Sequence, residues 1–235
     1  MRPVAIFRFS PTEGPAYVAD WLDAHGLAWS LVALDEGAPV PVDPRAFAGI
    51  GLMGGPMSVN DGLAWTEPLC SLLRAAVDAE VPVIGHCLGG QLLAKSQGAP
   101  VTRAPVAEIG WIDVAVSDAT AGREWFGGRT AFTPFQWHYD AFALPPGARR
   151  VLTNAFNADQ AYLIRDRHIG FQCHIEMTRE LVETWLATGA QELPGESSAA
   201  AQSAADIRRD LDTRVAALNT VAGDVYARWT RGLVR

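Results

Sequence analysis

The chain has 235 residues, of which 49% are hydrophobic and 19% charged, and its formal net charge is -7. This composition is typical of a folded globular protein, and the length fits a single domain. The negative charge disfavours nucleic acid and anionic lipid as partners, since both are polyanions. No apolar run reaches the roughly 18 residues of a membrane span, so we expect a cytoplasmic protein.

The first half of the chain alternates short apolar segments with amphipathic ones. Strands are predicted for the apolar segments 4–9, 28–34, 50–53 and 81–84. Helices are predicted for 16–25 and 65–80, where apolar side chains recur at helical spacing. Repeated strand–helix–strand units predict an α/β fold with a mostly parallel central sheet and helices on both faces. Ligands of such sheets bind beyond the carboxyl ends of the strands.

The second half is less regular. Strands are predicted for 101–116 and 130–135, a hairpin for 161–164 with 169–173, and a helix beginning at Thr178. Small polar residues follow, and then an apolar stripe at helical spacing. We therefore expect one α/β domain (1–190), a linker or mobile loop (191–205) and a C-terminal helix (206–235) packed on the same domain. A partner-binding helix is the alternative for this stripe.

The setting of Cys87 differs from that of the other two cysteines. Three widely spaced cysteines without a C-x-x-C pair disfavour both a disulfide framework and a zinc site. The stretch VIGHCLGGQLLAKSQG (83–98) places Cys87 between Gly85 and Gly89, after a predicted strand and before a predicted helix. This is a G-x-C-x-G form of the nucleophile elbow, and the amides of the helix start favour a thiolate. A small buried side chain is the alternative interpretation.

A thiolate nucleophile needs a base and a group that orients the base. Two of the five histidines are candidates: His138 in FQWHYD and His174 in FQCHIEMT. Glu176 lies two residues after His174, and in an extended segment this spacing puts both side chains on the same side of the backbone. We predict that His174 is the base and that Glu176 orients it.

Several motifs occur together in one order along the chain. They are GGPMSVND (54–61), GHCLGGQ (85–91), QWHYD (136–140), LPPGA (144–148) and QCHIE (172–176). In this order they resemble the class I, triad-type glutamine amidotransferases, especially stand-alone proteins similar to the glutaminase domain of GMP synthase. The resemblance covers about residues 45–190 and implies a flavodoxin-like sheet. Two positions depart from the pattern, where Ile175 replaces a usual proline and Cys173 a common phenylalanine.

The resemblance also implies roles for individual residues. Cys87 would attack the side-chain amide of glutamine to give a glutamyl thioester and ammonia, with His174 moving the proton and Glu176 orienting it. Backbone N–H groups of Gly55 and Leu88 would form the oxyanion hole. The substrate would be held by Gly54, Gln91, Gln136, Trp137 and His138. No metal and no organic cofactor is expected.

Three functions are compatible with these motifs. The first is a glutamine amidotransferase that releases ammonia for a separate synthetase, because the sequence has no G-x-x-x-x-G-K-[ST] motif and no room for an ATP-binding domain. The alternative is a free-standing hydrolase of γ-glutamyl peptides or amides. The third is a non-catalytic binding or regulatory module, against which the complete set of Cys87, His174 and Glu176 counts.

Overall fold

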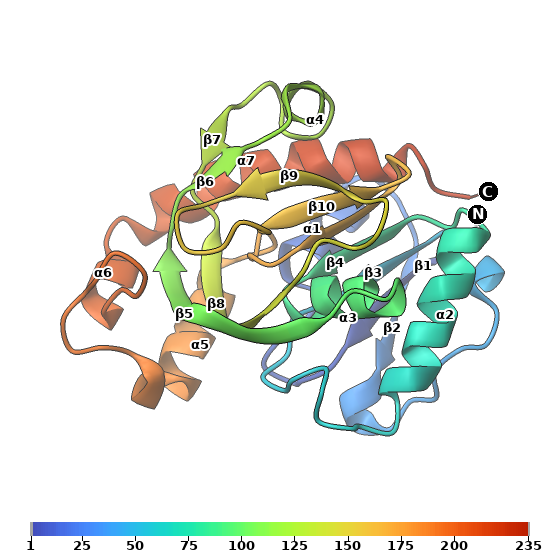
Figure 1. Cartoon of the computed structure of the whole chain (residues 1–235), viewed down its shortest axis with the longest axis horizontal. Coiled ribbons are helices and arrows are strands. Elements are labelled where there is room, and N and C mark those ends of the chain that lie inside the picture. The colour runs from blue at the N-terminus through green and yellow to red at the C-terminus, as the bar shows by residue number, and fades with distance from the viewer. Residues whose placement is uncertain (1, 235) are drawn as a thin grey trace.

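The computed structural model describes residues 2–234 and contains a nine-stranded sheet and a two-stranded sheet (Figure 1). The strand order of the large sheet is β2-β1-β3-β4-β11-β10-β9-β6-β7. Its strands are β1 (Val4–Arg8), β2 (Trp29–Ala33), β3 (Gly49–Leu52), β4 (Val83–His86), β6 (Val114–Val116), β7 (Ala131–Phe132), β9 (Arg149–Thr153), β10 (Ala161–Ile164) and β11 (His168–Phe171). The strands from β2 to β11 in this order are parallel, and the remaining four pair antiparallel. The predicted α/β fold with a mostly parallel sheet is confirmed.

Helices cover both faces of the large sheet. One face packs against α1 (Ala16–Ala24), α4 (Ala119–Trp125), α5 (Arg179–Thr188) and α7 (Leu211–Thr230). The other face packs against α2 (Thr66–Asp78) and α3 (Leu88–Ser96). In α2 the buried apolar side chains recur three and four residues apart, which places them on one side of the helix. Each fully buried side chain of this kind contributes roughly 1.5–3 kcal/mol to the free energy of folding.

The middle of the chain departs from the predicted strands. The predicted strand 101–116 divides into β5 (Val101–Trp111) and β6, which belong to different sheets. The predicted strand 130–135 covers β7 and only the first residue of β8 (Phe135–Phe142), which pairs with β5. Helix α4 and strand β9 were not predicted. The apolar pattern fails in β8 because Gln136 and His138 are buried among polar partners instead of hydrophobic ones.

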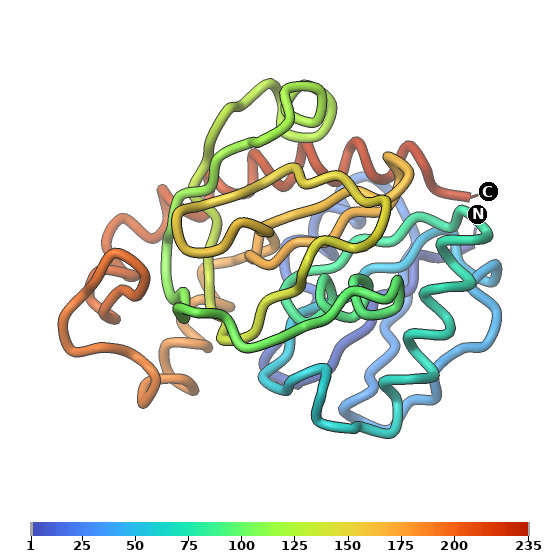
Figure 2. Tube along the Cα trace, viewed as in Figure 1, coloured from blue at the N-terminus to red at the C-terminus, as the bar shows by residue number. Residues whose placement is uncertain are grey.

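The last part of the chain folds back on the rest. It contains the short helices η3 (Ala190–Glu192) and α6 (Ala204–Arg208) before α7, which the left-handed backbone of Asp210 separates from α6. Between η3 and α6, Ala201 forms a parallel bridge with Ile109 of β5. The trace in Figure 2 shows this segment, in orange, beside the two-stranded sheet. Helix α7 buries Leu218 and Val225 in the core. In residues 2–234 we find no helix that is both long and apolar enough to cross a membrane.

Parallel pairing brings four chain segments to one edge of the sheet. The strands β1, β3, β4 and β11 all end at this edge, since β4 pairs in register with both β3 and β11. Two short 3-10 helices, η1 (Leu34–Glu36) and η2 (Pro44–Ala46), lie in the connections before β3. The segments that follow the four strands contain Glu13, Gly55, Cys87 and His174, so the topology explains why residues far apart in sequence meet there.

Candidate active site

Cys87 occupies a sharp turn between β4 and α3. Its φ is 48° and its ψ is -108°, a conformation that residues other than glycine rarely adopt. A Cβ on Gly85 would lie 2.5 Å from backbone atoms of Gly89, and a Cβ on Gly89 would lie 2.5 Å from Leu52. Both positions therefore need glycine, because strand, turn and helix approach too closely for a side chain. The turn presents the Cys87 thiol at the carboxyl edge of the sheet, at the start of a helix.

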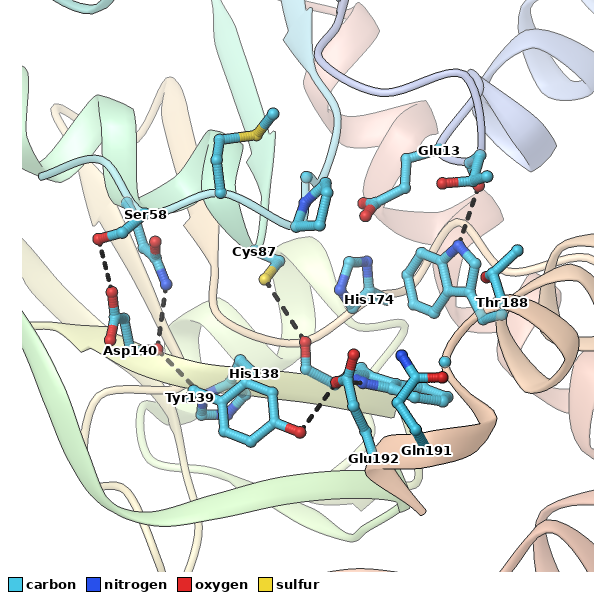
Figure 3. A pocket seen from close by; sticks show the side chains of 18 of the residues that line it. Glu13, Ser58, Cys87, His138, Tyr139, Asp140, His174, Thr188, Gln191 and Glu192 are labelled. Atoms are coloured by element: carbon cyan, nitrogen blue, oxygen red, sulfur yellow. Dashed lines mark hydrogen bonds between the residues drawn. The ribbon is translucent and has the colours of Figure 1, made fainter. Parts of the chain in front are cut away.

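His174 and Glu176 follow β11, the strand next to β4. His174 Nδ1 lies 2.6 Å from Glu176 Oε1, and both side chains are buried. The backbone of His174 is held by two hydrogen bonds with Phe135, of 2.8 and 3.1 Å. The ring of Trp185 packs edge-on against the imidazole, with 4.6 Å between the ring centroids. These contacts hold the imidazole next to Cys87 (Figure 3).

The charges of His174 and Glu176 stabilise each other. Burial opposes protonation of His174, but the negative charges of Glu176 and Cys87, and hydrogen bonds to both, raise the pKa of His174 well above its ordinary value. Burial also opposes ionisation of Glu176, but His86, His174 and the hydrogen bond from His174 lower the pKa of Glu176 to about 2. Both directions favour a Glu176 carboxylate paired with a His174 imidazolium next to Cys87.

His86 lies behind the pair and is completely buried. Its Nδ1 lies 3.3 Å from the carbonyl oxygen of Leu52, and its Nε2 lies 3.5 Å from the hydroxyl of Tyr226 and 3.9 Å from Glu176 Oε2. Burial lowers the pKa of His86, although Glu176 acts in the opposite direction. The His86 imidazole therefore closes the inner side of the site next to Glu176.

Two polar groups face the thiol from other elements. The carbonyl oxygen of Trp137 on β8 lies 4.0 Å from Cys87 Sγ, and Gln172 Nε2 lies 3.8 Å from the same sulfur. Gln91 on α3 donates from Nε2 to the carbonyl oxygen of Asp140 at 3.0 Å and to Gln172 Oε1 at 3.4 Å. The amides of Gln91 and Gln172 thus connect the first turn of α3 to β8.

The loop after β3 forms a wall beside Cys87. A Cβ on Gly55 would lie 2.5 Å from Leu88 Cδ2, so this loop touches the start of α3. The N–H of Gly89 donates to the carbonyl oxygen of Met53 at 3.1 Å and fixes the same contact. Main-chain amides from a glycine loop and a helix start can together stabilise a developing oxyanion.

Cys87 and His174 open into a cavity of about 640 Å³. Figure 3 shows that the cavity extends to both sides of the thiol. On one side lie Ser58 and Asp140, with a 2.7 Å hydrogen bond between them. On the other side lie His174, Glu13, Thr188 and Glu192. Trp185, which packs against the His174 ring, also lines the cavity. A nucleophile with space on both sides fits cleavage of a bond that joins two groups.

Comparison with known proteins agrees with this geometry. The family model described as "Glutamine amidotransferase class-I" matches residues 21–187, which is more than half of the chain. The chain belongs to the class-I glutamine amidotransferase family. The matched region includes the elbow at Cys87 together with His174 and Glu176.

Relatives of this member of the class-I glutamine amidotransferase family include proteins with different names. A crystal structure titled as a glutamine amido transferase from Methylobacillus flagellatus is 45% identical, with a TM-score of 0.97 over 100% of this chain and 96% of that chain. A GMP synthase [glutamine-hydrolyzing] from Aeropyrum pernix is 36% identical over 68% of this chain, but the match spans only 30% of that protein. Gamma-glutamyl peptidase 4 of Arabidopsis thaliana is 26% identical over 68% of this chain and 66% of its own length.

The five residues predicted to hold substrate fall into two groups in this family member. Gln91, Trp137 and His138 line the cavity, whereas Gly54 and Gln136 are not among the lining residues. Gln136 is fully buried and donates from Nε2 to Gln160 Oε1 at 2.9 Å. Both ring nitrogens of His138 are engaged, Nε2 with Glu108 at 3.1 Å and Nδ1 with the carbonyl oxygen of Asp140 at 3.1 Å.

Strand β8 is anchored by a contact between His138 and the buried side chain of Glu108. Glu108 on β5 is fully buried and contacts His138 Nε2, while accepting hydrogen bonds from Gln160 at 2.8 Å and from Asn154. Such a group is stable in the interior only when its oxygens have partners. This network fixes strand β8, in which the carbonyl oxygen of Trp137 faces the Cys87 thiol. His138 therefore helps to position the backbone of β8.

Three residues near the thiol were not predicted from the sequence. Glu13 follows β1, Ser58 lies in the glycine loop, and Gln172 comes directly after β11. Each is located where a parallel strand ends or in a motif already noted, which is the signal that could have identified them. Glu13 in particular lies in the segment SPTEGP, between a strand and a helix.

The other cysteines and acids do not form a second centre among the described residues. Cys70 and Cys173 are buried and unlinked to any disulfide, and burial raises the pKa of both thiols, for Cys70 to about 11. Within residues 2–234 no group of three or more His, Cys, Asp or Glu side chains could hold a metal ion.

Proposed function

We propose that this family member hydrolyses the γ-glutamyl amide bond of glutamine through a thioester on Cys87 and releases ammonia for a separate synthetase. The observation that carries the proposal is the buried row formed by Cys87, His174 and Glu176, in which His174 Nδ1 lies 2.6 Å from Glu176 Oε1. A strained elbow, a positioned imidazole and an orienting carboxylate together constitute the arrangement of a nucleophilic amide hydrolase.

In the first half of the reaction, the Cys87 thiolate adds to the amide carbon and the carbonyl oxygen becomes an oxyanion. The amides of Gly55 and Leu88 are the donors suited to this charge, because the Gly55 loop touches the start of α3. The His174 imidazolium then gives its proton from Nε2 to the amide nitrogen. The carbon–nitrogen bond breaks, ammonia leaves, and the γ-glutamyl group remains on sulfur as a thioester.

In the second half, water replaces ammonia next to His174. The imidazole, now neutral, takes a proton from water while the oxygen attacks the thioester carbon. The carbon–sulfur bond breaks, glutamate leaves, and the pair of thiolate and imidazolium is restored. Glu176 keeps Nδ1 protonated throughout, so that Nε2 carries out both transfers.

A synthetase partner is the second part of the proposal. The Aeropyrum relative is named a glutamine-hydrolysing GMP synthase, and the matched segment is 30% of its length. This supports a partner of the synthetase class that consumes the ammonia. Glutamine or another γ-glutamyl compound is the small-molecule partner.

A second function is favoured by the size of the cavity. Its volume of about 640 Å³ extends beyond His174, on the side where the leaving nitrogen is protonated, and leaves space for an amine larger than ammonia. The same thioester chemistry would then make the chain a free-standing γ-glutamyl amide hydrolase. The Arabidopsis relative named a gamma-glutamyl peptidase supports this candidate. The ionised pair at His174 and Glu176 counts against a non-catalytic module.

The test is release of ammonia and glutamate by the purified protein from glutamine and from a panel of γ-glutamyl amides and peptides. Turnover that disappears in Cys87→Ala is expected, with an unchanged circular dichroism spectrum. Turnover of a substituted amide without any partner would establish the free-standing hydrolase, and glutamine turnover that rises when a synthetase is added would establish the amidotransferase. Full activity in Cys87→Ala would overturn both.

A further inference from the structure

The tetrahedral intermediate assigns the two sides of the cavity to two parts of a substrate. Its carbon carries the sulfur of Cys87, the oxyanion, the leaving nitrogen and the γ-glutamyl chain. The oxyanion is directed toward Gly55 and Leu88, and the leaving nitrogen toward His174. The γ-glutamyl chain then extends away from His174, toward Ser58 and Asp140, and the leaving amine occupies the side of Glu13 and Thr188.

Glu13 borders the same open space beside Gly54 as His174, which protonates the leaving nitrogen in the proposed reaction. A Cβ on residue 54 would overlap Glu13 Oε2 and would lie 2.8 Å from His174 Cε1, so both groups border the space that Gly54 leaves open. In Figure 3 the Glu13 carboxylate points toward His174 from the loop after β1. Its oxygens form no hydrogen bond and no ion pair with any residue of the described chain 2–234.

The loop that carries Glu13 is held in place before any substrate binds. The N–H of Glu13 donates to the carbonyl oxygen of Ser10 at 3.1 Å, and the hydroxyls of Ser10 and Thr12 are 2.9 Å apart. Trp185 Nε1 donates to the carbonyl oxygen of Thr12 at 3.0 Å, and the same indole packs against His174. The carboxylate is therefore pre-organised relative to the catalytic imidazole.

An unpaired carboxylate in this position is suited to a cation. Burial raises the pKa of Glu13 to about 7, while His174 lowers it and Glu176 raises it further, and a bound cation would favour the ionised form. The second acid on this side, Glu192, accepts hydrogen bonds from Trp137 Nε1 and from the Tyr139 hydroxyl, each at 2.8 Å. Among residues 2–234, Arg103 is the one arginine that lines the cavity, and it contacts Tyr139 and Asp140 of β8.

We propose that Glu13 selects γ-glutamyl amides whose leaving amine carries a second, positively charged nitrogen, such as the monoamide of a short diamine. This inference deepens the proposed hydrolysis at Cys87 and rests on it. His174 protonates the nitrogen that leaves, the carbon–nitrogen bond breaks, and the distal ammonium of the amine keeps its charge and its contact with Glu13. Amines that carry a carboxylate, such as amino acids, are repelled from this side by the same charge.

The experiment compares three γ-glutamyl amides whose leaving chains have similar length and differ in charge. They are the amides of diaminobutane, pentylamine and aminobutyrate, which end in an ammonium, a methyl and a carboxylate. For the wild-type protein we expect kcat/KM to be highest for the diaminobutane amide, by about tenfold or more over the pentylamide, since a hydrogen bond between charged groups is at stake. The aminobutyrate amide is expected to be hydrolysed most slowly.

Variants at Glu13 test its role in substrate selection separately from the proposed hydrolysis at Cys87. Glu13→Gln should reduce the ratio of the first two kcat/KM values to within about threefold, and Glu13→Asp should retain part of the preference. Glu180→Gln is the matched control, because Glu180 is exposed at the start of α5 and outside the cavity, and its ratio should equal that of the wild type. Equal rates for all three charges in the wild type, or a Glu13→Gln variant that slows all three alike, would overturn the inference and leave the hydrolase standing. No hydrolysis of glutamine or of any γ-glutamyl amide, with or without an added synthetase, would instead refute the proposed function.

Discussion

Replacement of Glu176 by glutamine tests the role assigned to the buried carboxylate. In the wild type, Glu176 Oε1 lies 2.6 Å from His174 Nδ1, and the pKa of Glu176 is lowered to about 2 despite its burial. Glutamine has nearly the same shape but no charge. The substitution therefore removes the stabilisation of the His174 imidazolium while leaving the packing intact.

The size of the effect follows from the interaction that is lost. A hydrogen bond to a charged group contributes about 1.5–3 kcal/mol, which corresponds to about tenfold to a hundredfold in rate. The amide of a glutamine at 176 can also donate to Nδ1 and stabilise the wrong tautomer of His174, an error that costs about ten-thousandfold in a serine protease triad. We expect kcat/KM for glutamate release from Glu176→Gln to fall between about a hundredfold and ten-thousandfold.

The assay is glutamate release coupled to glutamate dehydrogenase, at several pH values. Alkylation of Cys87 by iodoacetamide provides a second readout, and its rate near neutral pH should fall because the positive charge of the His174 imidazolium next to the sulfur is lost. Glu180→Gln is the control for an acid removed from the same neighbourhood of the sequence. A folded Glu176→Gln variant with kcat/KM within threefold of the wild type would refute the reasoning.

Three further predictions concern the base, the core and the elbow. His174→Ala should abolish glutamate release, whereas His138→Ala should act through β8 and reduce kcat/KM less; the opposite ranking would mean that His138 is the base. Burial, together with nearby arginines, lowers the pKa of His168 to about 4. As the pH falls, the histidine of the unfolded chain is therefore protonated before that of the folded chain. The contribution of His168 to the free energy of unfolding is complete above about pH 6.5 and is lost progressively toward pH 4. Urea titrations should show a loss of about 2 kcal/mol between pH 7 and pH 5 that His168→Leu removes, and equal slopes would contradict this. Gly85→Ala should destabilise the protein by roughly 3 kcal/mol because the added Cβ would overlap backbone atoms of Gly89. Gly51→Ala is the control and should destabilise it far less, because the nearest atom to its added Cβ is 3.7 Å away. Equal melting temperatures for the two variants would be evidence against this.

The parallel half of the fold could be predicted because its strands and helices are marked by patterns among residues that are close together in the sequence. Strand β4 is a short, fully buried run that contains Gly85, and α2 repeats apolar side chains with helical period. The elbow at Cys87 was visible for the same reason, since the glycines that permit the turn are neighbours in sequence. His174 and Glu176 were recognisable because two residues of extended backbone place both side chains on one side.

The rest depended on contacts between distant segments. Strand β8 buries Gln136 and His138 against Gln160 and Glu108, and no pattern within β8 reveals partners that lie 24 and 30 residues away. Glu13 is an ordinary loop acid in the sequence. Only the folded structure places it in the space left open by Gly54, next to His174. The position of Glu13 depends on β1, β3, β4 and β11 ending at the same edge of the sheet, and the local sequence does not specify that arrangement.

The most direct test of the central claim is to find the γ-glutamyl group on Cys87. The purified protein is mixed with glutamine or with a reactive γ-glutamyl amide, quenched in acid during turnover, and mapped by mass spectrometry. A γ-glutamyl adduct is expected on the peptide that contains Cys87, and it should disappear in Cys87→Ala and accumulate in a variant slowed at His174. Turnover without any adduct, or an adduct on Cys70 or Cys173 instead, would contradict it.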